Sequence, residues 1–505
     1  MYGAPRPLLP QADLMMLTEA LNRWFSSVAT SQALGLAGQA ALARGDLDGA
    51  ARAVRDAGPT GTWVRLFVLG AAVGEAEAAA AISPWSVDAA VAVGVLERRA
   101  GQVHAALDVR PYSEAGGPDW WVVSDLGADV RPGVLRPDHV LGIGAAATTL
   151  AQATMRAPVA RALDIGTGCG VQSLHLSRYA GSITATDISE RALRMAAATA
   201  AINGIDLDLR RGSLLEPVAG ERFDAIVCNP PFIVGPGFSV DDGGFTYRDS
   251  GMAGDSVSEA LVRGLPALLN PGGRAQLLAN WAVTGEEEWS SRLQRWLTDS
   301  RCAAWVWQRE VADPAEYVSL WLRDSGEQPG SPAWTRRYEA WLDWFETEGV
   351  LAVGMGLVSM VRTGEAASVV CEDLPQAYEP FAGDEIEAWF YRHRWLGARD
   401  DAQLLRERVT PAAGLVLEDR SLLGTEGWVS ALTQLRQSGG LRWELEVDPA
   451  MAGLVAATAS GLPLGALVDV LAATNAVDPG ELAGIASPML RDLVQRGFLL
   501  PVAQN

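Results

Sequence analysis

The chain has 505 residues, which is too long for a single hydrophobic core, so we expect about two to four domains. Hydrophobic residues make up 49% and charged residues 20%, which is typical of a globular protein and excludes a disordered one. The net charge is −21, and all 40 basic residues are arginines. This charge repels polyanions, so it excludes indiscriminate nucleic-acid binding but leaves a local arginine patch open. The first thirty residues lack the pattern of a signal peptide, and no apolar run is long enough to span a bilayer. We therefore predict a cytoplasmic protein with no membrane partner.

The cysteines and histidines are few and scattered. Because the four cysteines lie far apart in a long chain, we expect reduced thiols rather than a disulfide framework. The four histidines have no ligand spacing among themselves or with the cysteines, so no metal site is predicted.

The two ends of the chain are predicted to be mainly helical. Near the N-terminus, helical stretches are followed by an extended pair at Val103–Val109, the outline of a winged helix, within a domain at 1–112. A similar pattern occurs in a third, α+β domain at 371–505. Its predicted elements include the strand Leu441–Val447, the helices Leu464–Ala473, Glu481–Ile485 and Pro488–Arg496, and the strand Phe498–Val502. Winged helices often bind DNA, but the acidity favours packing or substrate recruitment here.

The middle of the chain, 113–370, alternates apolar strands with amphipathic helices, which predicts an α/β fold with a parallel, Rossmann-like sheet. A polar helical insertion at about 312–348 separates the last two strands. Nine of the 18 tryptophans lie between Trp281 and Trp344, and the helical spacing of Trp334, Trp341 and Trp344 favours packing over a base-stacking platform. The first five predicted strands are Ala162–Ile165, Ile183–Thr186, Leu207–Arg210, Ala225–Cys228 and Arg274–Ala279.

A glycine-rich loop follows the first of these strands directly. Asp164 stands two residues before Gly166, and Thr167, Gly168 and Gly170 follow. Glycines allow a tight turn and a close approach of the backbone to a ligand. A dinucleotide fold needs its third glycine three positions after the second, whereas Gly170 follows Gly168 by two. The spacing therefore favours S-adenosylmethionine (SAM), with the Asp164 carboxylate near its cationic amino-acid end.

Two later strand ends add candidate cofactor contacts. Asp187 ends the second strand and is followed by Ile188; its carboxylate can accept hydrogen bonds from both ribose hydroxyls, although a helix cap is the alternative. Ser213 and Leu214 follow the third strand, where an adenine amino group would be met, although a plain turn is nearly as good an interpretation.

The fourth strand ends in Asn229, Pro230, Pro231 and Phe232. The prolines end the strand and stiffen the loop, so the Asn229 side-chain carbonyl and the Pro230 backbone carbonyl become two fixed acceptors. Such acceptors can hold the N–H bonds of a planar nitrogen and direct its lone pair at a methyl donor. Phe232 can stack on the planar group. We predict these four residues to be catalytic, with Asn229 also next to the cofactor.

With these motifs, residues 131–283 resemble the class I SAM-dependent methyltransferases that methylate release-factor glutamine, ribosomal-RNA guanine or DNA adenine. Two further segments, Arg136–Asp138 and Arg248–Gly251, resemble segments of the glutamine enzymes more weakly, and we call them the two echoes. The resemblance implies a seven-stranded sheet whose last strand, here Leu351–Val361, is antiparallel.

The resulting prediction is an N-methyltransferase that acts on a macromolecule, either an rRNA or tRNA base or a protein glutamine. Two alternatives remain: a methyltransferase of a peptide or small natural product, and a non-catalytic winged-helix protein that senses SAM. The complete Asn-Pro-Pro-Phe sequence argues against a sensor, because sensing needs only the cofactor loop.

Overall fold

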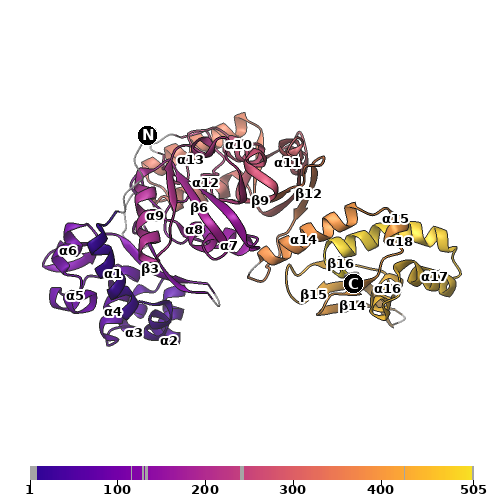
Figure 1. Ribbon diagram of the computed structural model, residues 1–505, viewed down its shortest axis with the longest axis horizontal. Helices are drawn as coiled ribbons and strands as arrows, with labels where there is room; N and C mark the ends of the chain where they lie inside the picture. The colour runs from indigo at the N-terminus through magenta and orange to yellow at the C-terminus, as the bar shows by residue number, and fades with distance from the viewer. Residues whose placement is uncertain are drawn as a thin grey trace. The chain divides into compact units, whose positions relative to one another are not determined.

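The computed structural model describes residues 8–114, 117–127, 130, 135–238, 244–380, 382–425 and 427–502. It divides into two compact units. The first comprises Met1–Ala151 and Ala157–Leu374, and the second comprises Gln152–Arg156 and Pro375–Asn505 (Figure 1). The predicted boundaries near residues 112 and 370 stay predictions, as do the winged helices. The resembling range 131–283 includes 131–134 and 239–243, which lie outside the described residues.

The first unit begins with helices whose apolar stripes meet in one cluster. The first of them, helix α1, buries Leu14, Leu17 and Leu21 along one side. The elements of this region are α1 (Gln11–Trp24), α2 (Ser27–Ala43), α3 (Leu47–Ala53), α4 (Gly58–Trp63), a π-helical turn (Val64–Val68), α5 (Glu75–Ile82), α6 (Val87–Ala92), β1 (Leu96–Arg99), β2 (Gln102–Ala105), β3 (Asp108–Ser113) and β4 (Asp119–Ser124).

The extended pair predicted at Val103–Val109 is two hairpins instead. β1 pairs with β2, and β3 pairs with β4, both antiparallel. Between the two hairpins, the backbone N–H groups of Ala106 and Leu107 donate to the carbonyl of Val95, so the chain turns there instead of continuing from β2 into β3 as one strand. The residues predicted as one extended pair therefore belong to two separate hairpins.

The centre of the first unit is a mixed sheet with the strand order β12-β10-β11-β9-β8-β5-β6-β7. Strands β5 to β9 are parallel to one another, whereas β11 runs antiparallel to both β9 and β10. The bounds are β5 (Val159–Ile165), β6 (Ala180–Asp187), β7 (Asp208–Arg211), β8 (Phe223–Cys228), β9 (Leu269–Thr284), β10 (Cys302–Ala312), β11 (Val350–Arg362) and β12 (Ser368–Asp373).

This sheet confirms the Rossmann-like α/β prediction and the antiparallel strand expected at Leu351–Val361. The number of seven strands is corrected to eight. Ser368–Asp373 pairs in parallel with β10 at the edge of the sheet, from Ala303↔Ser368 to Gln308↔Asp373. An edge strand bonds on one side only, so a short segment with polar ends suffices, and its sequence carries little strand signal.

Helices cover the sheet, and those between β10 and β11 form the predicted insertion. Leu163 and Ile165 of β5 pack in one apolar cluster with α10 and α11, while Asp164 between them meets α8, because successive side chains of a strand point to opposite faces. The bounds are α7 (Ala145–Ala153), α8 (Val171–Leu176), α9 (Glu190–Ile202), α10 (Ser256–Gly264), α11 (Trp289–Leu297), α12 (Pro314–Asp324) and α13 (Pro332–Thr347).

The helices of the insertion begin as the sequence suggests, since Pro314 and Pro332 stand at their first positions and Asp313 and Ser331 cap them. Their tryptophans pack inward. Trp334 and Trp341 join a buried cluster with Tyr317 and Phe345, which agrees with the packing interpretation.

The N-terminal helices and the sheet domain share a core within the first unit. One apolar cluster runs from Leu9 and Leu17 to Met195 and Ile202 of α9. Strand β4 also bonds to that helix, since the Val123 N–H donates to Thr199 Oγ1 at 3.1 Å. The N-terminal region thus packs directly against helix α9 of the sheet domain.

The second unit contains helices and small sheets. β13 pairs with β17, and β14, β15 and β16 form a second sheet, so the strands predicted at Leu441–Val447 and Phe498–Val502 are present in shorter form. The bounds are α14 (Ala382–Gly397), α15 (Asp401–Leu404), β13 (Val409–Pro411), β14 (Leu415–Gly424), β15 (Gly427–Gln437), β16 (Glu444–Glu446), α16 (Pro449–Ala457), α17 (Leu464–Asn475), α18 (Pro479–Gln495) and β17 (Leu499–Pro501).

The two helices predicted around Pro488 are one, α18, with Pro488 inside it. A proline removes the hydrogen bond to the carbonyl four residues earlier, here that of Gly484, which is exposed and can be hydrated. The buried residues Ala486, Leu490 and Val494 continue one apolar face through the proline. Packing therefore outweighs the local break. Within the described residues, no helix is long and apolar enough to cross a membrane.

Candidate functional site

A cavity of about 660 Å³ opens where β5, β6 and β8 end. β5 and β8 are neighbours in the sheet, and the strand order reverses between them, which is where such sheets bind ligands. Gly166, Thr167 and Gly168 after β5 line the cavity together with Asp187, the last residue of β6, and Asn229 after β8. The structure thus brings the two predicted motifs to one cavity.

The conformation of the glycine loop is fixed by its backbone angles and backbone hydrogen bonds. Gly166 and Gly168 have φ angles of 70° and 55°, and Gly170 one of 90°, all in the left-handed region that glycine adopts without strain. The N–H groups of Gly166 and Thr167 both donate to the carbonyl of Thr186 at 2.9 Å, which ties the loop to β6. Apart from its two chain neighbours, no described residue has an atom within 4 Å of the place that a Cβ would take at Gly168. That face of the loop is free for a ligand.

Asp164 holds this loop through a hydrogen bond with Thr167. It is fully buried and does not line the cavity. Its Oδ2 accepts hydrogen bonds from Thr167 Oγ1 and Ser173 Oγ, both at 2.7 Å, and its Oδ1 has no partner among the described residues. Burial raises the pKa of Asp164 to about 6, against the two hydroxyls, which lower it. Gly170, like Asp164, lies outside the lining.

Asp187 lines the cavity and also fixes the loop. Its Oδ2 accepts from the Gly168 N–H at 3.0 Å and its Oδ1 from the Ser189 N–H at 2.8 Å. Ser189, rather than Asp187, is the N-cap of α9. Each carboxylate oxygen can accept a second hydrogen bond, so Asp187 keeps acceptor capacity for a ligand. Burial raises its pKa.

The remaining predicted cofactor contacts also reach the cavity. Ile188, 53% exposed, lines it after Asp187, and Ser213 and Leu214 line it after β7. Leu214 has a φ of 47°, an uncommon conformation for leucine, in the turn that follows Ser213.

Three residues of the tetrapeptide line the cavity, Asn229, Pro230 and Pro231. A Cβ placed on Gly166 would lie 3.5 Å from the backbone oxygen of Asn229, so the tetrapeptide and the cofactor loop are in near contact. Phe232 is outside the lining, and its ring meets Trp321 edge to face with centroids 6.1 Å apart.

One wall of the cavity was not predicted from the sequence. It is formed by Thr246, Tyr247 and Asp249–Met252. The echo at Arg248–Gly251 was its only signal. The Thr246 N–H donates to the carbonyl of Pro137 at 2.9 Å, which joins this wall to the second echo, Arg136–Asp138. Asp138 of that second segment and the adjacent His139 line the cavity too.

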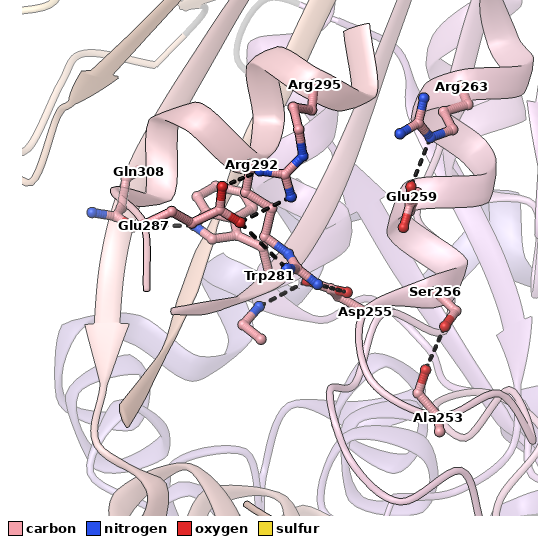
Figure 2. Close-up of polar contacts among 11 residues, drawn as sticks. Ala253, Asp255, Ser256, Glu259, Arg263, Trp281, Glu287, Arg292, Arg295 and Gln308 are labelled. Carbon is pink, nitrogen blue, oxygen red and sulfur yellow. Dashed lines mark hydrogen bonds and ion pairs between the residues drawn. The ribbon is translucent and has the colours of Figure 1, made fainter. Parts of the chain in front are cut away.

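An ion-pair network anchors the far end of this wall (Figure 2). Asp255, buried, accepts the Nε and Nη2 hydrogens of Arg292 at 2.7 and 2.8 Å and the N–H of Ala282 at 3.0 Å. The preceding residue, Gly254, donates its N–H to Gly235 at 2.8 Å, three residues after Phe232. Asp255 therefore joins the wall and the segment after the tetrapeptide to β9 and α11.

Two cysteines that line the cavity, Cys169 and Cys228, stay protonated. Burial raises the pKa of the Cys169 thiol to about 12 and that of Cys228 well above its usual value. Both are uncharged thiols at neutral pH, so the cavity offers no thiolate.

The residues of the cavity fit SAM. A bare glycine backbone at Gly168, a carboxylate with free acceptor capacity at Asp187 and a turn at Ser213 follow three consecutive strands along one edge of the sheet. These positions suit, in order, the amino-acid end, the ribose and the adenine of that cofactor, and the backbone oxygen of Asn229 lies 3.5 Å from the place that a Cβ would take at Gly166 of the same loop.

Comparisons with known proteins point the same way. Residues 141–242 match the family model described as "Methyltransferase small domain". Residues 25–106 and 387–501 match two models described as "Domain of unknown function", DUF7059 and DUF7782.

The chain is similar to curated proteins named "Ribosomal RNA small subunit methyltransferase C". That of Erwinia tasmaniensis is 31% identical over 187 residues, which are 36% of this chain and 49% of that protein. That of Serratia proteamaculans is 29% identical over 188 residues, which are 36% of this chain and 48% of that protein. The chain thus spans about half the length of the curated relatives it matches.

Among solved structures, a T. thermophilus 16S rRNA methyltransferase in complex with AdoMet and guanosine is 20% identical, with a TM-score of 0.26 over 52% of this chain and 66% of that one. The methyltransferase domain match, together with the fold, confirms the resemblance that the motifs indicated. The chain contains a class I SAM-dependent methyltransferase domain, and SAM is its cofactor.

Proposed function

We propose that this protein transfers the methyl group of SAM to a nitrogen of a base in ribosomal RNA. The observation that carries the proposal is the single cavity lined both by Gly166–Gly168 and by Asn229–Pro231. A methyl donor held by the loop and a planar nitrogen held by the tetrapeptide would meet in that space. The partial similarity to ribosomal-RNA methyltransferases supports RNA as the substrate class.

SAM, when bound, supplies an electrophilic methyl group on a sulfonium. The chain's own residues prepare the acceptor. The side-chain carbonyl of Asn229 and the backbone carbonyl of Pro230 would accept the two N–H bonds of an exocyclic amine. That arrangement turns the lone pair out of the π system and stabilises the positive charge that develops on nitrogen. The nitrogen lone pair would form the N–CH3 bond as the S–CH3 bond of the sulfonium breaks and its electron pair stays on sulfur, and the nitrogen would then release one proton to solvent water.

The neighbouring prolines supply rigidity. Pro230 and Pro231 fix φ, so the two acceptors lose little conformational freedom when the substrate binds. On the cofactor side, Asp187 would accept from the ribose hydroxyls, while Ser213 and Leu214 would meet the adenine. Asp164 would act through the loop, because it holds Thr167 rather than facing the cavity.

The proposal is tested by incubating the purified protein with tritiated SAM and a cell extract, followed by separation of RNA, protein and small molecules. We expect label in RNA, and within RNA in the ribosomal fraction. Label in protein would indicate a glutamine-type substrate, and label in small molecules a natural product. Either result would contradict the proposal, as would SAM binding without label in any fraction, the behaviour of a sensor.

A further inference from the structure

The cavity has an aromatic wall that lies outside the tetrapeptide. Phe232 packs against Trp321 and does not line the cavity. Among the described residues that line it, Tyr247 and His139 carry the only aromatic rings. Tyr247 belongs to the wall that follows the tetrapeptide along the chain. Among the described residues that line the cavity, it has the six-membered aromatic ring on which a planar group could stack.

Tyr247 is held in place from two sides. Its hydroxyl donates to Asp324 Oδ2 at 2.9 Å, and its ring meets that of His139 edge to face with centroids 6.0 Å apart. Burial raises the pKa of Tyr247, so the hydroxyl stays protonated and remains a donor at neutral pH. The ring is thus fixed before any ligand enters.

The residue that holds the hydroxyl belongs to the helical insertion. Asp324 is the last residue of α12, where the helix dipole disfavours a carboxylate. Trp321, one turn earlier, accepts a hydrogen bond on its backbone oxygen from Arg248, the neighbour of Tyr247. The end of α12 therefore makes polar contacts with Tyr247, which lines the cavity, and with its neighbour Arg248, which does not.

We propose that Tyr247, fixed by Asp324, is the ring that stacks on the nucleobase presented to Asn229. The inference rests on the proposed function and names a residue that selects its substrate class. A nucleobase offers a π-face large enough to cover a phenol ring, and stacking on that face favours the binding of a base. A glutamine amide is too small to cover the ring, so the same wall favours a base. The insertion between β10 and β11 thereby gains a role as the support of that wall.

The test is steady-state methylation of ribosomal RNA by the full chain, with SAM affinity measured separately by calorimetry. Tyr247→Leu removes the ring and keeps apolar bulk. We expect it to raise the KM for RNA by about fivefold or more while the Kd for SAM stays within about twofold. Asp324→Ala frees the ring without deleting it and should raise the KM by a smaller factor, with little further effect in the Tyr247→Leu background.

Tyr338→Leu is the matched control. Tyr338 is also half-buried and stacks on Trp334 in the insertion, but it does not line the cavity. It should leave both constants unchanged. An unchanged KM for RNA in Tyr247→Leu, or an equal loss of SAM affinity, would overturn the inference alone. A wild-type protein that labels no RNA would instead overturn the proposed function on which it rests.

Discussion

The carboxylate of Asp187 accepts a hydrogen bond from the backbone N–H of Gly168 at 3.0 Å. The acid at the end of β6 thus fixes the loop that follows β5, and its second oxygen is held by Ser189. One side chain therefore shapes the cofactor loop and offers acceptors to the ligand that the loop binds.

Replacing that carboxylate should weaken SAM binding. Asp187→Ala removes the proposed ribose acceptor and releases Gly168, and hydrogen bonds to charged groups contribute about 1.5–3 kcal/mol each. We expect the Kd for SAM, measured by calorimetry, to rise by about tenfold or more. Asp208→Ala, at the start of β7 and outside the cavity, is the control. Equal affinities of the two variants would contradict the assignment.

Asn229 should affect turnover rather than cofactor binding. Asn229→Ala removes one of the two proposed acceptors, and the loss of one group that stabilises charge in a transition state typically lowers kcat by about 10²–10³-fold. Asn229→Asp keeps an oxygen acceptor and should lie between alanine and wild type. The measurement is single-turnover methylation at saturating SAM. A variant with normal kcat but raised KM would show that Asn229 binds substrate without assisting the chemistry.

Asp164 should make stability depend on pH. Its pKa is raised to about 6 in the folded protein, so protonation stabilises the fold, and this contribution is lost as pH rises through about 6. Asp164→Asn removes the titration and keeps an oxygen for Thr167 and Ser173. The unfolding free energy of wild type relative to the variant should fall by about 1.4 kcal/mol between about pH 5 and pH 7.5, measured by urea denaturation. Parallel pH profiles would contradict the raised pKa.

Loss of the buried ion pair of Asp255, which anchors the cavity wall, should lower stability more than loss of an exposed ion pair. Asp255→Ala leaves Arg292 and the Ala282 N–H without their shared partner, and breaking a buried pair costs about 3 kcal/mol or more. We expect that loss in chemical denaturation, together with a raised KM for RNA. Glu259→Ala breaks the exposed pair with Arg263 on neighbouring α10 and should change stability by less than about 1 kcal/mol (Figure 2). Similar losses in both variants would contradict a special role for Asp255.

The sequence predicted the parts of the site that follow strands directly. Apolar runs such as Ala225–Cys228 are strands, and their ends meet at one edge of the sheet, so Asp187 and Asn229 could be placed together from spacing alone. The antiparallel strand at Leu351–Val361 followed from the resemblance, and the structure confirms it as β11.

The rest depended on contacts between distant segments. Tyr247 lies in a loop without periodicity, and its partner Asp324 is 77 residues away, so no local pattern could join them. Asp164 illustrates the same limit: its place in the motif suggested contact with the cofactor, but alternation along β5 turns it toward Ser173 of α8. Pro488 carries a local signal for a helix end, and the apolar face that continues through it outweighs that signal.

The most direct test of the proposed chemistry is mass spectrometry of ribosomal-RNA nucleosides after incubation with SAM and either wild-type protein or Asn229→Ala. We predict a nucleoside that carries one added methyl group on nitrogen with wild type, and at least about a hundredfold less of it with the variant, although both proteins bind SAM equally. A methyl group on carbon or oxygen, or equal product from both proteins, would contradict the role of Asn229 as the acceptor that orients a planar nitrogen.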